Sequence, residues 1–199
     1  MFVYLSKKAS QFCVSNNIIQ NEDAEVYEYG FEILLSTLIN AVAIFVVSIL
    51  TGNFVATLFF CIGFLPLRMT AGGYHAKTHL RCFLILMASY IAFLAVLYKL
   101  PQALYLIAVS ISSAISFFLI FVFSPIEDIN KPISDTERVK FKKKSRIIIS
   151  VFIIVAFGLY YILSFETYAL AFLLGVLTAS LSLLASLIKN ILYQVKNSH

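Results

Sequence analysis

Charged residues are scarce in this sequence, and their scarcity excludes a soluble globular domain. Only 13% of the 199 residues are charged, whereas 61% are hydrophobic and the mean hydropathy is +0.93. Ordinary globular domains carry about 25% charged residues. Several apolar runs approach or exceed the roughly 18 residues that identify a membrane-spanning helix. The composition therefore predicts an all-α, polytopic membrane protein.

Acidic and basic side chains are also missing from the middle of the apolar runs, where Glu32, near the end of one run, is the nearest exception. Ion-coupled transporters and proton pumps usually carry such residues inside the membrane, so their absence disfavours that class. Cysteine is rare as well. The three residues, Cys13, Cys61 and Cys82, are odd in number and widely spaced, which argues against a disulfide framework.

The apolar runs predict a single integral-membrane domain over residues 1–199 with an interfacial amphipathic segment at 1–30. Short polar joints, such as Lys99 to Pro101, separate several of the runs. Joints of this length favour antiparallel helical hairpins. We place six spans in the chain, at about residues 31–51, 54–70, 81–98, 103–123, 147–165 and 167–188.

Basic residues are distributed very unevenly between the two ends of these spans. Fourteen of the fifteen Lys and Arg residues fall on one side, and Lys99 alone falls on the other. The positive-inside rule then places both termini, the segment from Arg68 to Cys82 and the basic loop 124–146 in the cytoplasm. The net charge of +5 follows from this topology, so we predict no nucleic-acid partner.

One polar interval, Arg68 to Cys82, lies between two apolar runs that are short for membrane spans. The run Phe54–Leu67 has 14 residues and the run Cys82–Tyr98 has 17, whereas a helix needs about 20 to cross the hydrocarbon core. Both helices must therefore extend into the interval, which places residues 68–81 at or slightly below the membrane surface as a loop or re-entrant segment. The interval holds two of the three histidines and one cysteine, and it is the candidate site.

His75 and Cys82 could form a catalytic pair, since a thiolate nucleophile needs a base to take its proton. On a straight helix the two residues would stand about 10.5 Å apart along the axis, out of contact. Gly72 and Gly73 make a break upstream plausible, because glycine tolerates backbone conformations that other residues avoid. If the third span begins near Cys82, the positive end of that helix would stabilise the thiolate.

Other interpretations of the interval stay open. His79 is three residues from Cys82 and is the natural base if the segment is one continuous helix. In that case His75, His79 and Cys82 share a face and could hold zinc. The zinc metalloprotease motif needs an acidic residue where Ala76 stands, and we predict no metal or cofactor. A polar turn with incidental His and Cys is the simplest alternative.

Several of these residues stand in a pattern that resembles a known family. Arg68, the run Gly72-Gly73-Tyr74-His75-Ala76 and Cys82 resemble the signature of AgrB, the accessory gene regulator B membrane peptidases. The run Ser124-Pro125-Ile126-Glu127 and the pair Lys131-Pro132 look like the Pro…Lys-Pro cytoplasmic loop of that family. Length, span count and the basic loop agree, so the resemblance covers nearly the whole chain.

The resemblance implies a cysteine endopeptidase in the cell membrane of a Gram-positive bacterium. It would trim the C-terminal part of a small AgrD-like quorum-sensing propeptide and cyclise the remainder to a thiolactone or lactone. Carried over, His75 is the general base, Cys82 is the nucleophile that forms a thioester, and Arg68, Gly72 and Gly73 support the site. The family also implies a homodimer.

The basic run at the end of the 124–146 loop has two interpretations. Substrates of the family carry an acidic C-terminal tail, which these side chains could hold electrostatically. They could instead serve topology and contact anionic membrane lipid. The run comprises Lys140, Lys142, Lys143, Lys144 and Arg146. A peptide exporter or non-catalytic scaffold is the alternative function, and Cys82→Ser separates it from a peptidase.

Overall fold

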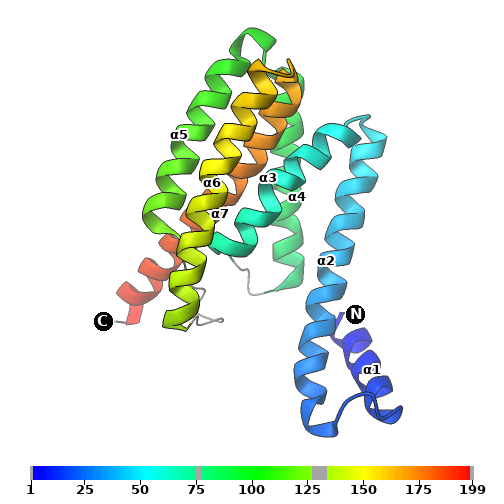
Figure 1. The fold of residues 1–199 in the computed structure, drawn as a ribbon. Coiled ribbons are helices and arrows are strands. Elements are labelled where there is room, and N and C mark those ends of the chain that lie inside the picture. Colours follow the sequence, from blue (N-terminus) through cyan, green and yellow to red (C-terminus); the bar gives the residue numbers. More distant parts are fainter. Residues whose placement is uncertain (1, 75–77, 127–133, 198–199) are drawn as a thin grey trace.

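The computed structural model describes residues 2–74, 78–126 and 134–197, and this part of the chain is all-α. A 3₁₀ turn, Asn21–Asp23, precedes α2, and another, Gln102–Leu104, precedes α5. Figure 1 shows the arrangement. The helices of the described residues are α1 (Phe2–Ser15), α2 (Ala24–Leu50), α3 (Phe54–Ala71), α4 (His79–Lys99), α5 (Tyr105–Phe123), α6 (Asp135–Tyr161) and α7 (Glu166–Asn197).

Six of these helices, α2 to α7, are long and apolar enough to cross a membrane, which confirms the predicted number of spans in a multi-pass membrane protein. Three of them extend past the expected bounds: α2 begins at Ala24, α6 begins at Asp135, and α7 continues to Asn197. At α6 the reason is a capping box. The Ser134 hydroxyl accepts from the Glu137 backbone N–H, and the Glu137 carboxylate accepts from the Ser134 N–H. Such a box starts a helix whatever the hydropathy of the residues that follow it.

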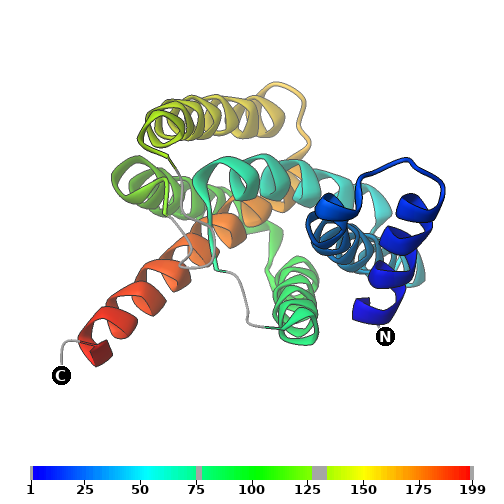
Figure 2. The same ribbon diagram turned by 90° about the horizontal axis from the view of Figure 1, so that it is seen from below.

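Helices α3 and α7 form the centre of the bundle, where their backbones approach closely at two glycines. A Cβ at Gly63 would collide with the carbonyl oxygen of Phe172, and one at Gly175 would collide with that of Phe60. Small residues permit this close helix contact in membrane proteins. Figure 2 shows α6 and α4 on opposite sides of the α3–α7 pair, with α5 beside α7. The buried core accordingly draws mainly on α3, α5, α6 and α7.

The N-terminal helix α1 packs along α2, apart from this centre (Figure 1). The hydroxyl of Ser10 on α1 donates a hydrogen bond to the carbonyl of Ala24 at 2.7 Å, so the two helices form a hairpin. Within the segment 1–30, Glu25 and Glu28 already lie in the first turns of α2. The polar opening of the chain is thus mostly helical.

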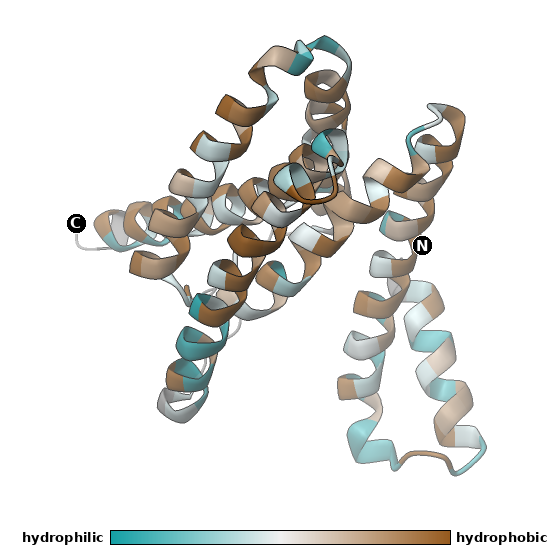
Figure 3. Ribbon diagram, turned by 45° about the horizontal axis from the view of Figure 1, so that its top comes forward, coloured by the Kyte–Doolittle hydropathy of each residue, from teal (hydrophilic) through white to brown (hydrophobic). Residues whose placement is uncertain are grey.

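The connections alternate between the two ends of the bundle. The joints between α2 and α3, α4 and α5, and α6 and α7 lie at one end, while Arg68, Arg81 and the first turns of α6 lie at the other (Figure 1). Figure 3 shows the hydrophilic first turns of α6 at that second end. The structure therefore places the basic residues of these elements at one end of the bundle and Lys99, the last residue of α4, at the other.

Candidate functional site

The candidate site begins where α3 stops. The helix ends at Ala71, and Gly72 has a φ of 85°, a conformation that side-chain-bearing residues rarely adopt. Gly72 forms an isolated parallel bridge with Ile126, whose N–H donates to the carbonyl of Ala71 at 3.1 Å. A Cβ at Gly72 would collide with the Ile126 carbonyl oxygen. The end of α3 is therefore joined by main-chain contacts to the segment that follows α5.

Tyr74, the residue before the predicted base, is held from two helices. Arg68 on α3 donates through Nη2 to the Tyr74 carbonyl at 2.6 Å. The Tyr74 N–H donates to the carbonyl of Ser182 on α7 at 2.9 Å and lies 3.2 Å from its Oγ. The Nζ of Lys189, also on α7, is 5.3 Å from the centroid of the Tyr74 ring. Gly73, with a φ of 145°, lies so close to Arg68 and Ser182 that a Cβ would collide with both.

Arg68, Gly72 and Gly73 all contact the backbone between Ala71 and Tyr74, and their role in supporting a catalytic site stays a prediction. The sequence did not reveal Ser182, and it gave Ile126 only as part of the run that resembles the family's cytoplasmic loop, without its contact at Ala71. Ser182 stands in an apolar stretch with several other serines and carries no local signal. Ile126 contributes through its backbone, which no sequence pattern records. Only the tertiary structure brings them to the site.

Cys82 lies in the first turn of α4 and is half-buried. Thr78 is the N-cap of that helix: its side-chain oxygen accepts from the Arg81 N–H at 3.4 Å, and its carbonyl accepts from the Cys82 N–H at 3.1 Å. Cys82 is a free thiol one turn from the N-terminus of α4. The helix start predicted near Cys82 is confirmed.

His75 lies outside the described residues, as do Ala76, Glu127, Lys131 and Pro132. The structure does correct one alternative: α3 ends at Ala71 and α4 begins at His79, so no continuous helix runs over 75–82. Gly72 ends α3, and Thr78, which has an extended backbone, is the N-cap of α4. The shared helical face proposed for His75, His79 and Cys82 is therefore wrong. Among the described residues, no three His, Cys, Asp or Glu side chains gather as a metal site.

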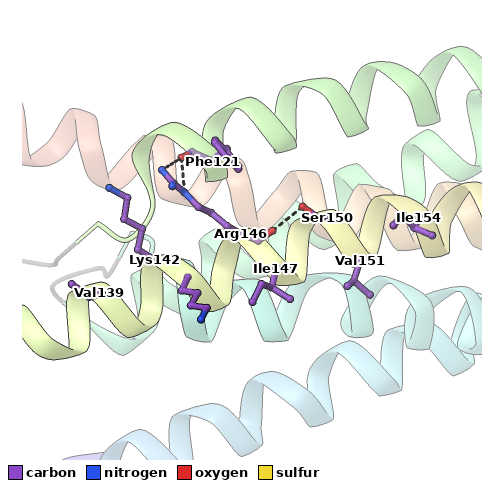
Figure 4. A pocket seen from close by; sticks show the side chains of 9 residues that line it. Phe121, Val139, Lys142, Arg146, Ile147, Ser150, Val151 and Ile154 are labelled. Carbon is purple, nitrogen blue, oxygen red and sulfur yellow. Dashed lines mark hydrogen bonds between the residues drawn. The ribbon is translucent and has the colours of Figure 1, made fainter.

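A groove of about 580 Å³ lies at the same end of the bundle, between α6 and the last turn of α5 (Figure 4). The guanidinium of Arg146 donates through Nε and Nη2 to the carbonyl of Phe121, at 3.1 and 2.8 Å, and its central carbon is 4.3 Å from the Phe121 ring centroid. Of the five predicted basic residues, Lys140 and Lys144 lie outside the lining. The lining residues are Phe121, Val139, Lys142, Lys143, Arg146, Ile147, Ser150, Val151 and Ile154.

Comparison with known proteins identifies the family. The accessory gene regulator B family matches residues 6–184. An AgrB-like protein of Clostridium perfringens (strain SM101 / Type A) is 29% identical over 188 residues, which cover 88% of each chain. AgrB-like protein 2 of Clostridium perfringens (strain 13 / Type A) is 26% identical over 161 residues, 78% of this chain and 75% of the relative. No solved structure matches. The chain belongs to the AgrB family, which supports a role in processing a quorum-sensing propeptide.

Proposed function

We propose that the protein is a membrane cysteine endopeptidase that cleaves a small AgrD-like propeptide and cyclises the N-terminal product. The single observation that carries this proposal is the placement of Cys82, a half-buried free thiol in the first turn of α4. Earlier in the same polar interval, the backbone is held at Ala71 by Ile126 and at Tyr74 by Arg68 and Ser182. Family membership supplies the class of substrate.

In the first step the Cys82 thiol gives its proton to His75, and the sulfur bonds to a carbonyl carbon of the propeptide. The peptide C–N bond then breaks, and His75 passes the proton to the leaving amine of the C-terminal fragment. The product is a thioester between Cys82 and the shortened peptide. Hydrogen bonds from Arg68 and to Ser182 hold Tyr74, the residue before His75, and positioning of reacting groups is a principal source of rate acceleration.

In the second step a Cys or Ser side chain of the bound peptide attacks the thioester. The Cys82–acyl bond breaks, the thiol is regenerated, and a thiolactone or lactone ring closes. Attack by water is the competing reaction. An internal nucleophile has the advantage of a high effective concentration, and a site beside the hydrocarbon region restricts water.

The ends of the propeptide would meet different surfaces of the protein. An acidic tail is attracted to the exposed lysines at the start of α6, of which Lys140 and Lys144 lie outside the groove. An amphipathic leader would lie in the membrane interface beside the bundle. We assign this whole reaction to the cytoplasmic side of a Gram-positive cell membrane, in a homodimer.

Mass spectrometry of the full-length protein in lipid with a candidate propeptide tests the proposal. We expect a C-terminally trimmed peptide attached to the wild type and no adduct on Cys82→Ser or His75→Ala. Cys61→Ser is the matched control, because Cys61 is also a free thiol but lies within α3, and it should react like the wild type. Intact peptide bound equally by all four proteins would contradict a peptidase and indicate a scaffold or exporter. If the adduct were lost in Cys82→Ser but kept in His75→Ala, the general base would be His79 and not His75.

A further inference from the structure

We propose that the groove on α6 is a binding site for one anionic phospholipid of the membrane. The phosphate would lie at the cationic end of the lining, which is formed by Lys142, Lys143 and Arg146. One acyl chain would follow the apolar side chains further along the helix, which Figure 4 shows as Ile147, Val151 and Ile154. This proposal does not depend on the catalytic chemistry of Cys82. It assigns a ligand to three of the five basic residues that the sequence singled out.

The position of Arg146 along α6 matches the depth of a lipid headgroup. The 19 residues from Ile147 to Phe165 contain no charged side chain, and the next charge is Glu166 at the start of α7. Fifteen of these residues, Ile147 to Tyr161, are helical in α6 and rise about 22 Å, and the four residues of the joint to α7 extend this apolar stretch toward the roughly 30 Å thickness of the hydrocarbon core. Arg146 therefore stands at the boundary where phosphate groups lie, with Lys142 and Lys143 just outside it.

The cationic end of the groove is fixed in place. Phe121 is in the last turn of α5, and its carbonyl would otherwise lack a helical partner. Arg146 satisfies it with two hydrogen bonds. One turn away, the buried hydroxyl of Ser124 donates to that of Ser145 at 2.7 Å, which holds α5 against α6. A guanidinium held in this way loses little entropy on binding a phosphate, and arginine suits phosphate geometry.

The lining combines positive charge with an apolar continuation. It contains three cations and no carboxylate, and Ile147, Val151 and Ile154 follow each other at helical spacings of four and three residues. These three side chains are exposed on the protein surface, so they face the acyl chains of the bilayer. Positive charge above an apolar track is complementary to an anionic amphiphile.

An acidic peptide tail fits the groove less well. A peptide carries backbone N–H and C=O groups that need hydrogen-bond partners once they leave water. Beyond the cations, the only polar side chain of the lining is that of Ser150, whose hydroxyl donates to the Arg146 carbonyl at 2.9 Å. An acyl chain needs no such partners. The chemistry of the lining thus favours a lipid over a peptide.

Native mass spectrometry of the full-length protein in neutral detergent tests the proposal. Phosphatidylglycerol and phosphatidylcholine with identical acyl chains are titrated separately. We expect the wild type to bind phosphatidylglycerol at least about tenfold more tightly, since each basic residue near a membrane surface contributes roughly a fivefold factor. Equal binding of the two lipids would overturn the proposal.

Paired lysine variants locate the site. Lys142→Gln/Lys143→Gln removes two cations from the lining and should weaken phosphatidylglycerol binding about 20-fold. The matched control, Lys140→Gln/Lys144→Gln, removes the same charge from the same turns outside the lining and should weaken it less than about threefold. If both double variants lost phosphatidylglycerol binding equally, the lipid would be attracted by the overall surface charge and the proposed site would be wrong. Arg146 is left intact, because it also holds α5.

Two further measurements test the occupant. Val151→Trp fills the apolar track without changing charge and should weaken both lipids, whereas unchanged binding would overturn the placement of the acyl chain. A synthetic acidic peptide should leave phosphatidylglycerol bound. If that peptide displaced the lipid from the wild type, the lipid assignment would be wrong and the groove would be a binding site for an acidic peptide tail.

Discussion

Arg68 and Ser182 hold Tyr74 from opposite sides: the guanidinium of Arg68 donates to the Tyr74 carbonyl at 2.6 Å, and the Ser182 carbonyl accepts from the Tyr74 N–H at 2.9 Å. The two helices at the centre of the bundle, α3 and α7, thereby both bind one residue of the polar interval between Arg68 and Cys82. The direction in which the chain leaves toward residue 75 is set by the packing of the core itself.

Arg68→Lys should lower processing by about 100-fold, since displacement of catalytic groups by about 1 Å has that order of effect. Lysine keeps the charge but cannot reproduce the planar, branched donor of arginine. Formation of the Cys82 adduct with propeptide is the measurement, with circular dichroism as the check on folding. An Arg68→Lys variant as active as the wild type would show that charge alone suffices at this position.

Gly73→Ala should abolish adduct formation without unfolding the protein. The added Cβ would collide with Arg68 and Ser182, and the φ of 145° is strained for alanine. Gly30→Ala is the matched control, because nothing lies within 4 Å of a Cβ at Gly30, inside α2. It should leave activity intact and stabilise the protein slightly, by about 0.5–1 kcal/mol, because alanine is favoured over glycine inside a helix. Equal activity of the two variants would contradict the tight cradle described around Gly73.

Gly175→Ala should destabilise the bundle by about 1–3 kcal/mol, the usual cost of overpacking a close contact. Its Cβ would collide with the backbone of Phe60, so α3 and α7 would have to separate. Gly158→Ala on α6 serves as the control, because its Cβ meets nothing within 4 Å. Thermal unfolding in detergent measures the difference, and equal melting temperatures would indicate that the two central helices are not tightly packed there.

The side of the membrane on which the site lies can be tested with thiol labelling. In a Cys13→Ser/Cys61→Ser background, a membrane-impermeant maleimide should label Cys82 in inside-out vesicles and leave it unlabelled in right-side-out ones, as the positive-inside rule predicts. Lys99→Cys in a protein without the native cysteines should show the opposite pattern, because position 99 ends α4 at the other end of the bundle. Labelling of both positions from one side would contradict the topology.

The sequence predicts most of the fold because local signals mark the ends of the helices. The joint at Thr51–Asn53 carries a glycine with a φ of 70°, the one at Lys99–Pro101 carries a proline, and both separate helices as expected. The predicted start of the fifth span was too late because the spans were located by their apolar residues. The helix α6 begins earlier, at the Ser134 capping box, where the residues are polar. Helical turns made of charged residues do not appear as an apolar run in a hydropathy profile.

Only some residues of the candidate site can be identified from the sequence. Cys82 and Arg68 stand out because thiols and cations are rare in this chain. Ser182 cannot be recognised in this way, because its contact with Tyr74 joins residues 108 positions apart and depends mainly on a backbone carbonyl. Long-range main-chain contacts depend on how helices pack, and no local pattern encodes them.

The hydrogen bond from the Ile126 N–H to the Ala71 carbonyl has a consequence for how the sequence can drift during evolution. It uses backbone atoms only, so any apolar residue of similar size at position 126 preserves it. Proline is the exception, because it has no N–H to donate. A relative with proline at that position would lose the hydrogen bond that ties the end of α3 to the chain beyond α5, although its hydropathy profile would look the same.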